Sequence, residues 1–172
     1  QNWNCYYAGW DASDLTTVTQ ATGIHHPSGD VKKICRENDA PYHSNNGGAA
    51  TWYITQWEQG VTEPGSSGSP LFDQNHRIIG QLWGGGASCQ NLSAPDYYGR
   101  VANSWMPAGS NSTNQLKYWL DPTNSGASFI DGFDPNNSTV VALDAALSGA
   151  QLTAQAVCGD NYLPTFSLMN VG

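Results

Sequence analysis

Short runs of apolar or alternating residues, separated by clusters of Gly, Pro, Asn and Asp, follow one another through the first half of the chain. Runs of this length between turn-forming residues predict short strands of an antiparallel, all-β domain. The predicted strands are Tyr6–Ala8, Thr22–His25, Val31–Ile34, Thr51–Ile54, Pro70–Phe72 and Arg77–Trp83. The polar turn 73–76 between the last two runs predicts a hairpin.

The pattern changes after residue 104. Apolar side chains recur at helical spacing from Asn114 to Leu120, and Asp121 and Pro122 follow, so a short helix is predicted there. The segment 131–138 is polar and rich in turn residues, as a linker would be. We therefore expect one β domain over 1–133, followed over 134–172 by a linker and the first strands of a truncated β extension.

The composition excludes several classes of function. With 172 residues, 39% of them hydrophobic, the chain can bury one ordinary core. A net charge of -8 with only six Lys and Arg argues against nucleic acid as a partner. No apolar run reaches the length of about 18 residues that a membrane helix needs. We therefore expect neither nucleic acid nor membrane as a partner.

Four cysteines and an acidic, amide-rich composition fit an oxidising, extracellular setting. Cys5 and Cys35 lie on strand-like stretches, and antiparallel neighbours would bring their Cβ atoms within bridging distance. We predict this disulfide, whose loop closure would contribute about 3 to 4 kcal/mol. Cys89 either pairs with Cys158 or has its partner in an N-terminal portion absent from this chain, and the second interpretation is favoured.

The segment 61–72 carries the candidate chemistry. A serine beside glycine on a tight turn before a strand offers an exposed hydroxyl and backbone N–H groups free to face an oxyanion. Ser67 would attack a carbonyl carbon, while the amides of Gly65 and Ser67 would stabilise the oxyanion, each donor contributing about 3 to 4 kcal/mol. From the motif alone, a Gly-Ser linker without chemistry is an equal alternative.

The surrounding sequence resembles lysyl endopeptidases, which are trypsin-type serine proteases of bacteria. Family-like stretches follow in order at 8–11, 24–27, 61–70, 80–82, 88–89, 98–101, 119–122 and 129–132, and the resemblance covers residues 6 to 133. It implies that this part is the second, six-stranded antiparallel Greek-key barrel of a chymotrypsin-like double barrel, with a short C-terminal helix. The tail after residue 134 resembles the opening strands of Ig-like adhesion modules.

The resemblance also implies site residues. Ser67 would be the nucleophile, Gly65 part of the oxyanion hole, and Asp96 the carboxylate of the primary specificity pocket. A carboxylate at the bottom of a narrow pocket selects a cationic side chain, because an unpaired buried ammonium is costly. By pattern alone, Asp96 would instead be a surface residue of a turn.

Two further positions concern substrate binding and activation. Trp83 and Gly84 lie where the substrate backbone would bind, and Trp83 replaces a histidine of the family, which makes lysine over arginine selectivity less secure than basic selectivity. Ser66 stands where trypsin has the aspartate that binds a freed N-terminus. Lysyl endopeptidases also have serine there, so activation by that salt bridge is not expected.

The histidine and aspartate that would complete a triad are expected before this chain, on the first barrel. The chain's own histidines are interpreted as structural or solvated: His25, His26, His43 and His76. The adjacent pair His25 and His26 lacks metal-ligand spacing and no Cys-x-x-Cys pair occurs, so neither a metal nor another cofactor is expected.

The sequence therefore predicts part of a secreted bacterial serine endopeptidase that cleaves peptide bonds after basic residues, lysine preferred. Its partners would be a protein or peptide substrate and the missing N-terminal barrel, and this chain alone is expected to be inactive. One alternative is a catalytically dead, protease-like binding or adhesion module. Another is an ordinary all-β adhesin fragment in which the motif at 65–70 is accidental.

Overall fold

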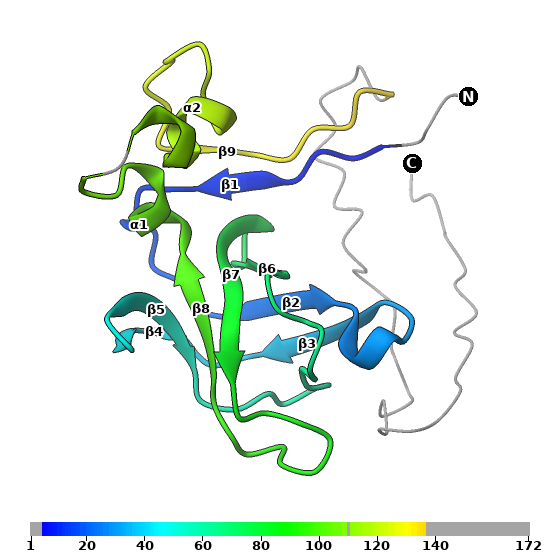
Figure 1. The fold of residues 1–172 in the computed structure, drawn as a ribbon. Coiled ribbons are helices and arrows are strands. Elements are labelled where there is room, and N and C mark those ends of the chain that lie inside the picture. The colour runs from blue at the N-terminus through cyan, green and yellow to red at the C-terminus, as the bar shows by residue number, and fades with distance from the viewer. Residues whose placement is uncertain (1–4, 110, 137–172) are drawn as a thin grey trace.

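The computed structural model describes residues 5–109 and 111–136 and consists mainly of short strands (Figure 1). The strands are β1 (Gly9–Asp11), β2 (Ala21–His25), β3 (Lys33–Glu37), β4 (Tyr42–Asn46), β5 (Ala49–Ile54), β6 (Pro70–Phe72), β7 (Arg77–Gly85), β8 (Asp96–Arg100) and β9 (Phe129–Ile130). The helical elements are the 3-10 turns η1 (Pro27–Gly29) and η2 (Ser112–Asn114) and the helices α1 (Val101–Trp105) and α2 (Leu116–Leu120). The all-β class and the short C-terminal helix are confirmed.

The strands of the described residues form one sheet with the hydrogen-bonded order β3-β2-β6-β7-β8-β5-β4. Strand β1 pairs with β7 in parallel and with β9 antiparallel, and the pairs along the main path are antiparallel. The path places β2 beside β6 and β5 beside β8, although these strands are far apart in the sequence (Figure 1). Closure of this sheet into a barrel stays a prediction.

The core is formed by side chains from the inner face of this sheet. Ile54 of β5, Leu71 of β6 and Tyr98 of β8 are completely buried. The indole of Trp52 packs among them, and its Nε1 donates to the carbonyl of Ile79 at 3.1 Å, which satisfies its polar atom inside the core. The core therefore fixes β5, β6, β7 and β8, the strands that flank the candidate site.

Most predicted strands lie within one or two residues of the observed ones, but the strand predicted at Tyr6–Ala8 is displaced. Tyr7 forms only an isolated bridge with Phe133, and the regular strand is β1. The displacement follows from Gly9, where a β-carbon would lie 2.3 Å from the carbonyl oxygen of Ile130. Only glycine allows β1 to approach the end of β9 so closely.

The predicted disulfide between Cys5 and Cys35 is not formed, and both are free thiols. Cys35 is buried in β3 opposite Gly23 of β2, and burial raises the pKa of its thiol. Cys5 is exposed, and the chain after it runs toward β7 and β9 rather than β3. The prediction failed because the two cysteine segments are not neighbours in the sheet.

Cys89 is disulfide-bonded, so the interpretation that leaves it without a mate in this chain is not supported. Its alternative mate, Cys158, lies outside the described residues. The predicted β extension and its Ig-like resemblance also lie outside them from residue 137 onward. Among the described residues no helix has the length and apolar character needed to cross a membrane.

Candidate active site

Ser67 lies exposed on the loop 61–69, which joins the region after β5 to β6 and is called here the nucleophile loop. Gly65 and Gly68 on either side have φ angles of +96° and +83°. These values lie in the left-handed region, which costs other residues about 1 kcal/mol or more. The two glycines allow the sharp turn that presents the Ser67 side chain to solvent.

The backbone N–H groups of residues 65–69 of the nucleophile loop divide into two sets. Those of Ser66, Gly68 and Ser69 donate to the carbonyls of Glu63, Leu82 and Ser66 at 3.1, 2.8 and 3.0 Å. Those of Gly65 and Ser67 donate to no acceptor in the part of the chain that the structure describes. The two predicted oxyanion donors are therefore the ones that the fold leaves available for a ligand.

Asp96 is 1% exposed and lies at the start of β8. Its Oδ2 accepts hydrogen bonds from Trp57 Nε1 and Thr62 Oγ1, both at 2.7 Å. Burial raises the pKa of this carboxyl, and the hydrogen bonds oppose that shift. Because Thr62 belongs to the nucleophile loop, Asp96 is tied directly to the segment that carries Ser67. The interpretation as a surface aspartate is wrong.

Gly85 lies beside the second oxygen of this carboxylate. A β-carbon on Gly85 would lie 1.9 Å from Asp96 Oδ1. The absence of a side chain on β7 therefore leaves room for the carboxylate at this position. One carboxylate oxygen is bound by two donors, and the other faces the backbone of β7.

Trp83 and Gly84 occupy a bulge in β7. The pairing with β8 shifts register between Leu82 and Gly84, so Trp83 is the extra residue. Bulges redirect side chains, and Trp83 is 54% exposed. A β-carbon on Gly47, at the tip of the β4–β5 hairpin, would lie 3.3 Å from its indole. Trp83 therefore lies at the hairpin tip and directly follows Leu82, whose carbonyl accepts the N–H of Gly68 in the nucleophile loop.

The histidines make contacts away from the Ser67 hydroxyl. His26 Nδ1 lies 3.3 Å from the carbonyl of Asp30, His43 Nε2 lies 3.2 Å from Asp14, and His76 has a left-handed φ of 60° in the β6–β7 turn. His25 is buried and shares a hydrogen bond with Ser66. Within the described residues, no histidine is hydrogen-bonded to Ser67.

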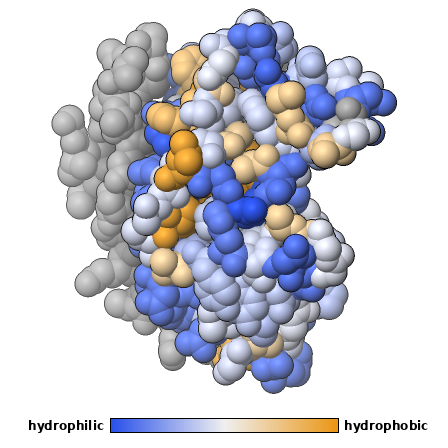
Figure 2. Space-filling view, turned by 90° about the vertical axis from the view of Figure 1, so that its left-hand side faces the viewer, coloured by the Kyte–Doolittle hydropathy of each residue, from blue (hydrophilic) through white to orange (hydrophobic). Residues whose placement is uncertain are grey.

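A groove of about 370 Å³ opens beside the nucleophile loop. Its walls come from β1, β6, β7, α1 and α2, and Gly68 and Pro70 bring it next to Ser67. The surface in Figure 2 is largely hydrophilic, with a few hydrophobic clusters and a hollow between the upper and lower parts of the molecule. Most residues that line the groove have apolar side chains or none, so the groove is an apolar surface that adjoins the candidate nucleophile.

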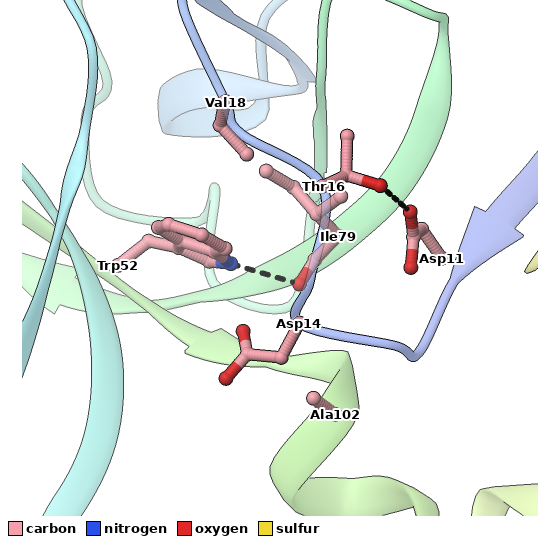
Figure 3. Close-up of a pocket in the computed structure, with 7 residues that line it drawn as sticks. All are labelled: Asp11, Asp14, Thr16, Val18, Trp52, Ile79 and Ala102. Carbon is pink, nitrogen blue, oxygen red and sulfur yellow. Dashed lines mark hydrogen bonds between the residues drawn. The ribbon is translucent and has the colours of Figure 1, made fainter. Parts of the chain in front are cut away.

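The pocket drawn in Figure 3 has a different character. It is lined by Asp11, Asp14, Thr16, Val18, Trp52, Ile79 and Ala102, and its volume is about 10 Å³. Such a volume holds about one water molecule. Thr16 Oγ1 donates to Asp11 Oδ2 at its edge, which fixes the loop after β1. This pocket is too small for a peptide side chain and is not part of the candidate site.

One acidic cluster of the described residues has side-chain atoms close enough to bind a cation together: Glu37, Asp39 and Glu58. Glu37 is buried, whereas Asp39 and Glu58 are exposed. Glu37 Oε1 accepts the N–H of Asp39 at 2.9 Å. The pKa of Glu37 is raised to about 7, mainly by burial and to a smaller extent by the neighbouring Glu58. Glu58 lies three residues before the nucleophile loop, but among the described residues the carboxylates of this cluster accept hydrogen bonds from the N–H groups of Asn38 and Asp39, so the cluster bears on stability rather than on the site.

We expect the stability of the protein to fall as the pH rises from about 4.5 to about 7, because the folded state holds the Glu37 proton more tightly than the unfolded chain. Glu37→Gln should flatten this slope and stabilise the protein at pH 8 by about 1 kcal/mol. Urea unfolding at pH 5 and pH 8 measures both effects. Asp39→Asn, on an exposed side chain, is the control, and an unchanged slope in Glu37→Gln would contradict the prediction.

Some contacts of the site were not predicted from the sequence. Thr62 lies in a family-like stretch, which was a signal for its role. No sequence pattern connects Trp57 with Asp96, which is 39 residues away. The contact between His25 and Ser66 spans 41 residues and was likewise not predicted. The site is thus assembled from β2, the nucleophile loop, β7 and β8.

Comparison with known proteins identifies the family to which this chain belongs. Residues 1–99 match the family model described as lysyl endopeptidase, C-terminal domain. A lysyl endopeptidase of Pseudomonas aeruginosa is 33% identical over 88 residues, which are 49% of this chain and 19% of the relative. This chain therefore covers about a fifth of the length of the curated relative that it matches.

A solved structure also overlaps with part of the chain. The crystal structure of Rv3671c from M. tuberculosis H37Rv, a Ser343Ala mutant in an inactive form, matches with a TM-score of 0.39 and 14% sequence identity. The overlap covers 53% of this chain and 46% of the other. An overlap this weak does not bear on function.

Proposed function

Because this chain belongs to the lysyl endopeptidase family, through its C-terminal domain, we propose that it is the nucleophile-bearing part of a serine endopeptidase. Membership supports a protease-like function in general. The proposed reaction is hydrolysis of peptide bonds after basic residues, lysine preferred. Substrates are proteins or peptides, and the complete protein is secreted.

In this proposal Ser67 Oγ attacks the scissile carbonyl carbon and forms a tetrahedral intermediate. The N–H groups of Gly65 and Ser67, which the fold leaves unpaired among the described residues, donate to its oxyanion. A histidine of the N-terminal barrel would take the proton of the Ser67 hydroxyl, and an aspartate of that barrel would orient the histidine. The described residues supply the nucleophile and the oxyanion donors.

Selectivity for a basic residue comes from Asp96. The substrate's ammonium group would pair with Oδ1, the carboxylate oxygen to which neither Trp57 nor Thr62 donates. Trp57 and Thr62 keep Oδ2 in place, so that the carboxylate needs no rearrangement when it pairs. Trp83 and Gly84 lie on the bulged end of β7, where the substrate backbone would bind.

The missing partner in this proposal is the N-terminal barrel of the protease. The groove beside Gly68 and Pro70 is where a second domain would bring its histidine to Ser67. Exposed aromatic side chains lie on the elements around it, among them Tyr118 and Trp119 of α2. An apolar surface next to the nucleophile fits a domain interface. The isolated chain would then lack a general base.

The observation that carries the proposal is an exposed Ser67 on a loop in which the N–H groups of Gly65 and Ser67 have no acceptor among the described residues and Thr62 donates to Asp96. A fluorophosphonate probe tests it on the complete protein, because the probe reacts only with an activated serine hydroxyl. We expect a covalent adduct that peptide mapping places at Ser67, and no adduct on the isolated chain 1–172. An unlabelled complete protein would instead indicate a protease-like binding module.

A further inference from the structure

His25 is the last residue of β2 and is only 2% exposed. Strand β2 pairs with β6, with Gly23 opposite Leu71, and β6 begins three residues after Ser67. The end of β2 is thereby directed at the nucleophile loop. The sheet therefore places a buried imidazole beneath the residues that precede the nucleophile.

The imidazole makes one hydrogen bond there. His25 Nδ1 lies 2.9 Å from Ser66 Oγ, and Ser66 is itself 2% exposed. Ser66 Oγ also accepts the N–H of Glu63 at 3.4 Å. In the part of the chain that the structure describes, His25 Nε2 has no hydrogen-bond partner. Ser66 is thus the only hydrogen-bonded side chain on the His25 ring among these residues.

A second contact joins the same two segments. The N–H of Ser28, three residues after His25, donates to the carbonyl of Pro64 at 2.7 Å. The segment 25–28 therefore binds the nucleophile loop at Pro64 through backbone and at Ser66 through side chains. Pro64 and Ser66 enclose Gly65, and Ser66 precedes Ser67. The two attachments therefore lie on either side of Gly65, and one of them is next to Ser67.

The charge state of His25 suits a neutral hydrogen bond. Burial, and then the neighbouring His26, lowers the pKa of His25, which keeps the ring uncharged near neutral pH. Ser66 is uncharged as well. The pair can thus bind the loop inside the protein without the desolvation cost of an ion pair.

We propose that His25 is a positioning residue of the protease, which holds Gly65 and Ser67 in their oxyanion-binding orientation through its hydrogen bond to Ser66. This inference rests on the proposed function. His25 touches neither substrate nor the reacting atoms, so it acts on the rate of acylation and not on substrate affinity. A histidine that only fills space would have no such selective effect.

The test uses the complete protein with the variants His25→Ala, His25→Asn, Ser66→Ala and the double variant His25→Ala/Ser66→Ala. Asparagine places an amide near the position of Nδ1 and can keep the bond to Ser66. His26→Ala, on the exposed neighbour, is the matched control. The measurements are kcat and KM on a lysyl amide, the rate of fluorophosphonate labelling, and the melting temperature.

We expect His25→Ala to lower kcat and the labelling rate about 10- to 100-fold, as a small misplacement of catalytic groups does. KM should stay within about threefold, and His25→Asn should recover most of the rate. The double variant should be no slower than the slower single variant, because both remove the same bond. His26→Ala should behave like the wild type.

Two results would overturn the inference: a His25→Ala protein with wild-type kcat, or losses that multiply in the double variant. If His25→Ala does not fold, Ser66→Ala and His25→Asn decide the question, since equal kcat in Ser66→Ala and the wild type overturns it too. An inactive wild type is a separate outcome, because it would overturn the proposed function and the inference with it.

Discussion

Ser67→Ala in the complete protein is expected to lower kcat by about a millionfold, as removal of a triad nucleophile does. The methyl group cannot attack a carbonyl carbon, whereas the N–H groups of Gly65 and Ser67 remain available for the oxyanion. Residual catalysis of about a thousandfold over the uncatalysed reaction should therefore persist. Substrate affinity should change little, because the Asp96 contacts do not involve the Ser67 hydroxyl.

Steady-state hydrolysis of a lysyl amide, with peptide binding measured separately, checks this prediction. Ser69→Ala is a matched control on the same loop. Ser69 contributes its backbone, since its N–H donates to Ser66 and its carbonyl accepts from Leu82, and alanine keeps both bonds. Ser69→Ala should retain activity within a few fold. A Ser67→Ala protein as active as Ser69→Ala would exclude Ser67 as the nucleophile.

Asp96→Asn is expected to lower kcat/KM for lysyl substrates by about a hundred- to thousandfold. The reason is that a lysine ammonium would be buried without its counter-charge, which costs about 3 kcal/mol or more. Substrates with an uncharged residue before the cleaved bond should lose much less, so the selectivity ratio should fall. Lowering the pH through the raised pKa of Asp96 protonates its carboxyl and removes the counter-charge. Cleavage after lysine by the wild type should therefore also fall as the pH is lowered.

The matched control is Asp73→Asn, which alters another buried carboxylate away from the site. Asp73 Oδ1 accepts the N–H groups of Asn75 and Arg77, both at 2.9 Å, and so stabilises the β6–β7 turn. This variant should lower the melting temperature with kcat/KM within about twofold of the wild type. Comparison of lysyl, arginyl and norleucyl substrates measures the selectivity. Unchanged selectivity in Asp96→Asn would remove Asp96 from the proposed pocket.

The fold class could be predicted because alternation, turn residues and helical spacing each depend on residues that are close together in the sequence. Alternation and turn residues predicted strands close to β2, β5, β6 and β7, and helical spacing predicted α2. Strand β4 was not predicted, because its residues Tyr42–Asn46 are mostly polar. It forms only because the turn at Gly47 and Gly48, with φ of 57° and 85°, returns the chain along β5. Whether β4 forms therefore depends on its pairing with β5 and not on the preferences of its own residues.

The disulfide prediction shows where pattern reasoning fails. Whether Cys5 meets Cys35 depends on which strands become neighbours, and the entropic cost of loop closure differs little between alternative partners that lie dozens of residues apart. The sheet places β1 beside β7 and β9, and β3 beside β2. The two cysteines are thereby separated. Strand order is a property of the whole core, and no spacing between cysteines encodes it.

The sequence by itself determined which residues are candidates for the site: the serine between permissive glycines at 65–68 and, through the resemblance, Asp96. Only the tertiary structure decided which residues hold them. Trp57, Thr62 and His25 meet their partners 39, 34 and 41 residues away. Local dihedral preferences act over a few residues and so can be read from the sequence. These contacts require β2, β5 and β8 to pack around one buried core, which the whole chain forms at once.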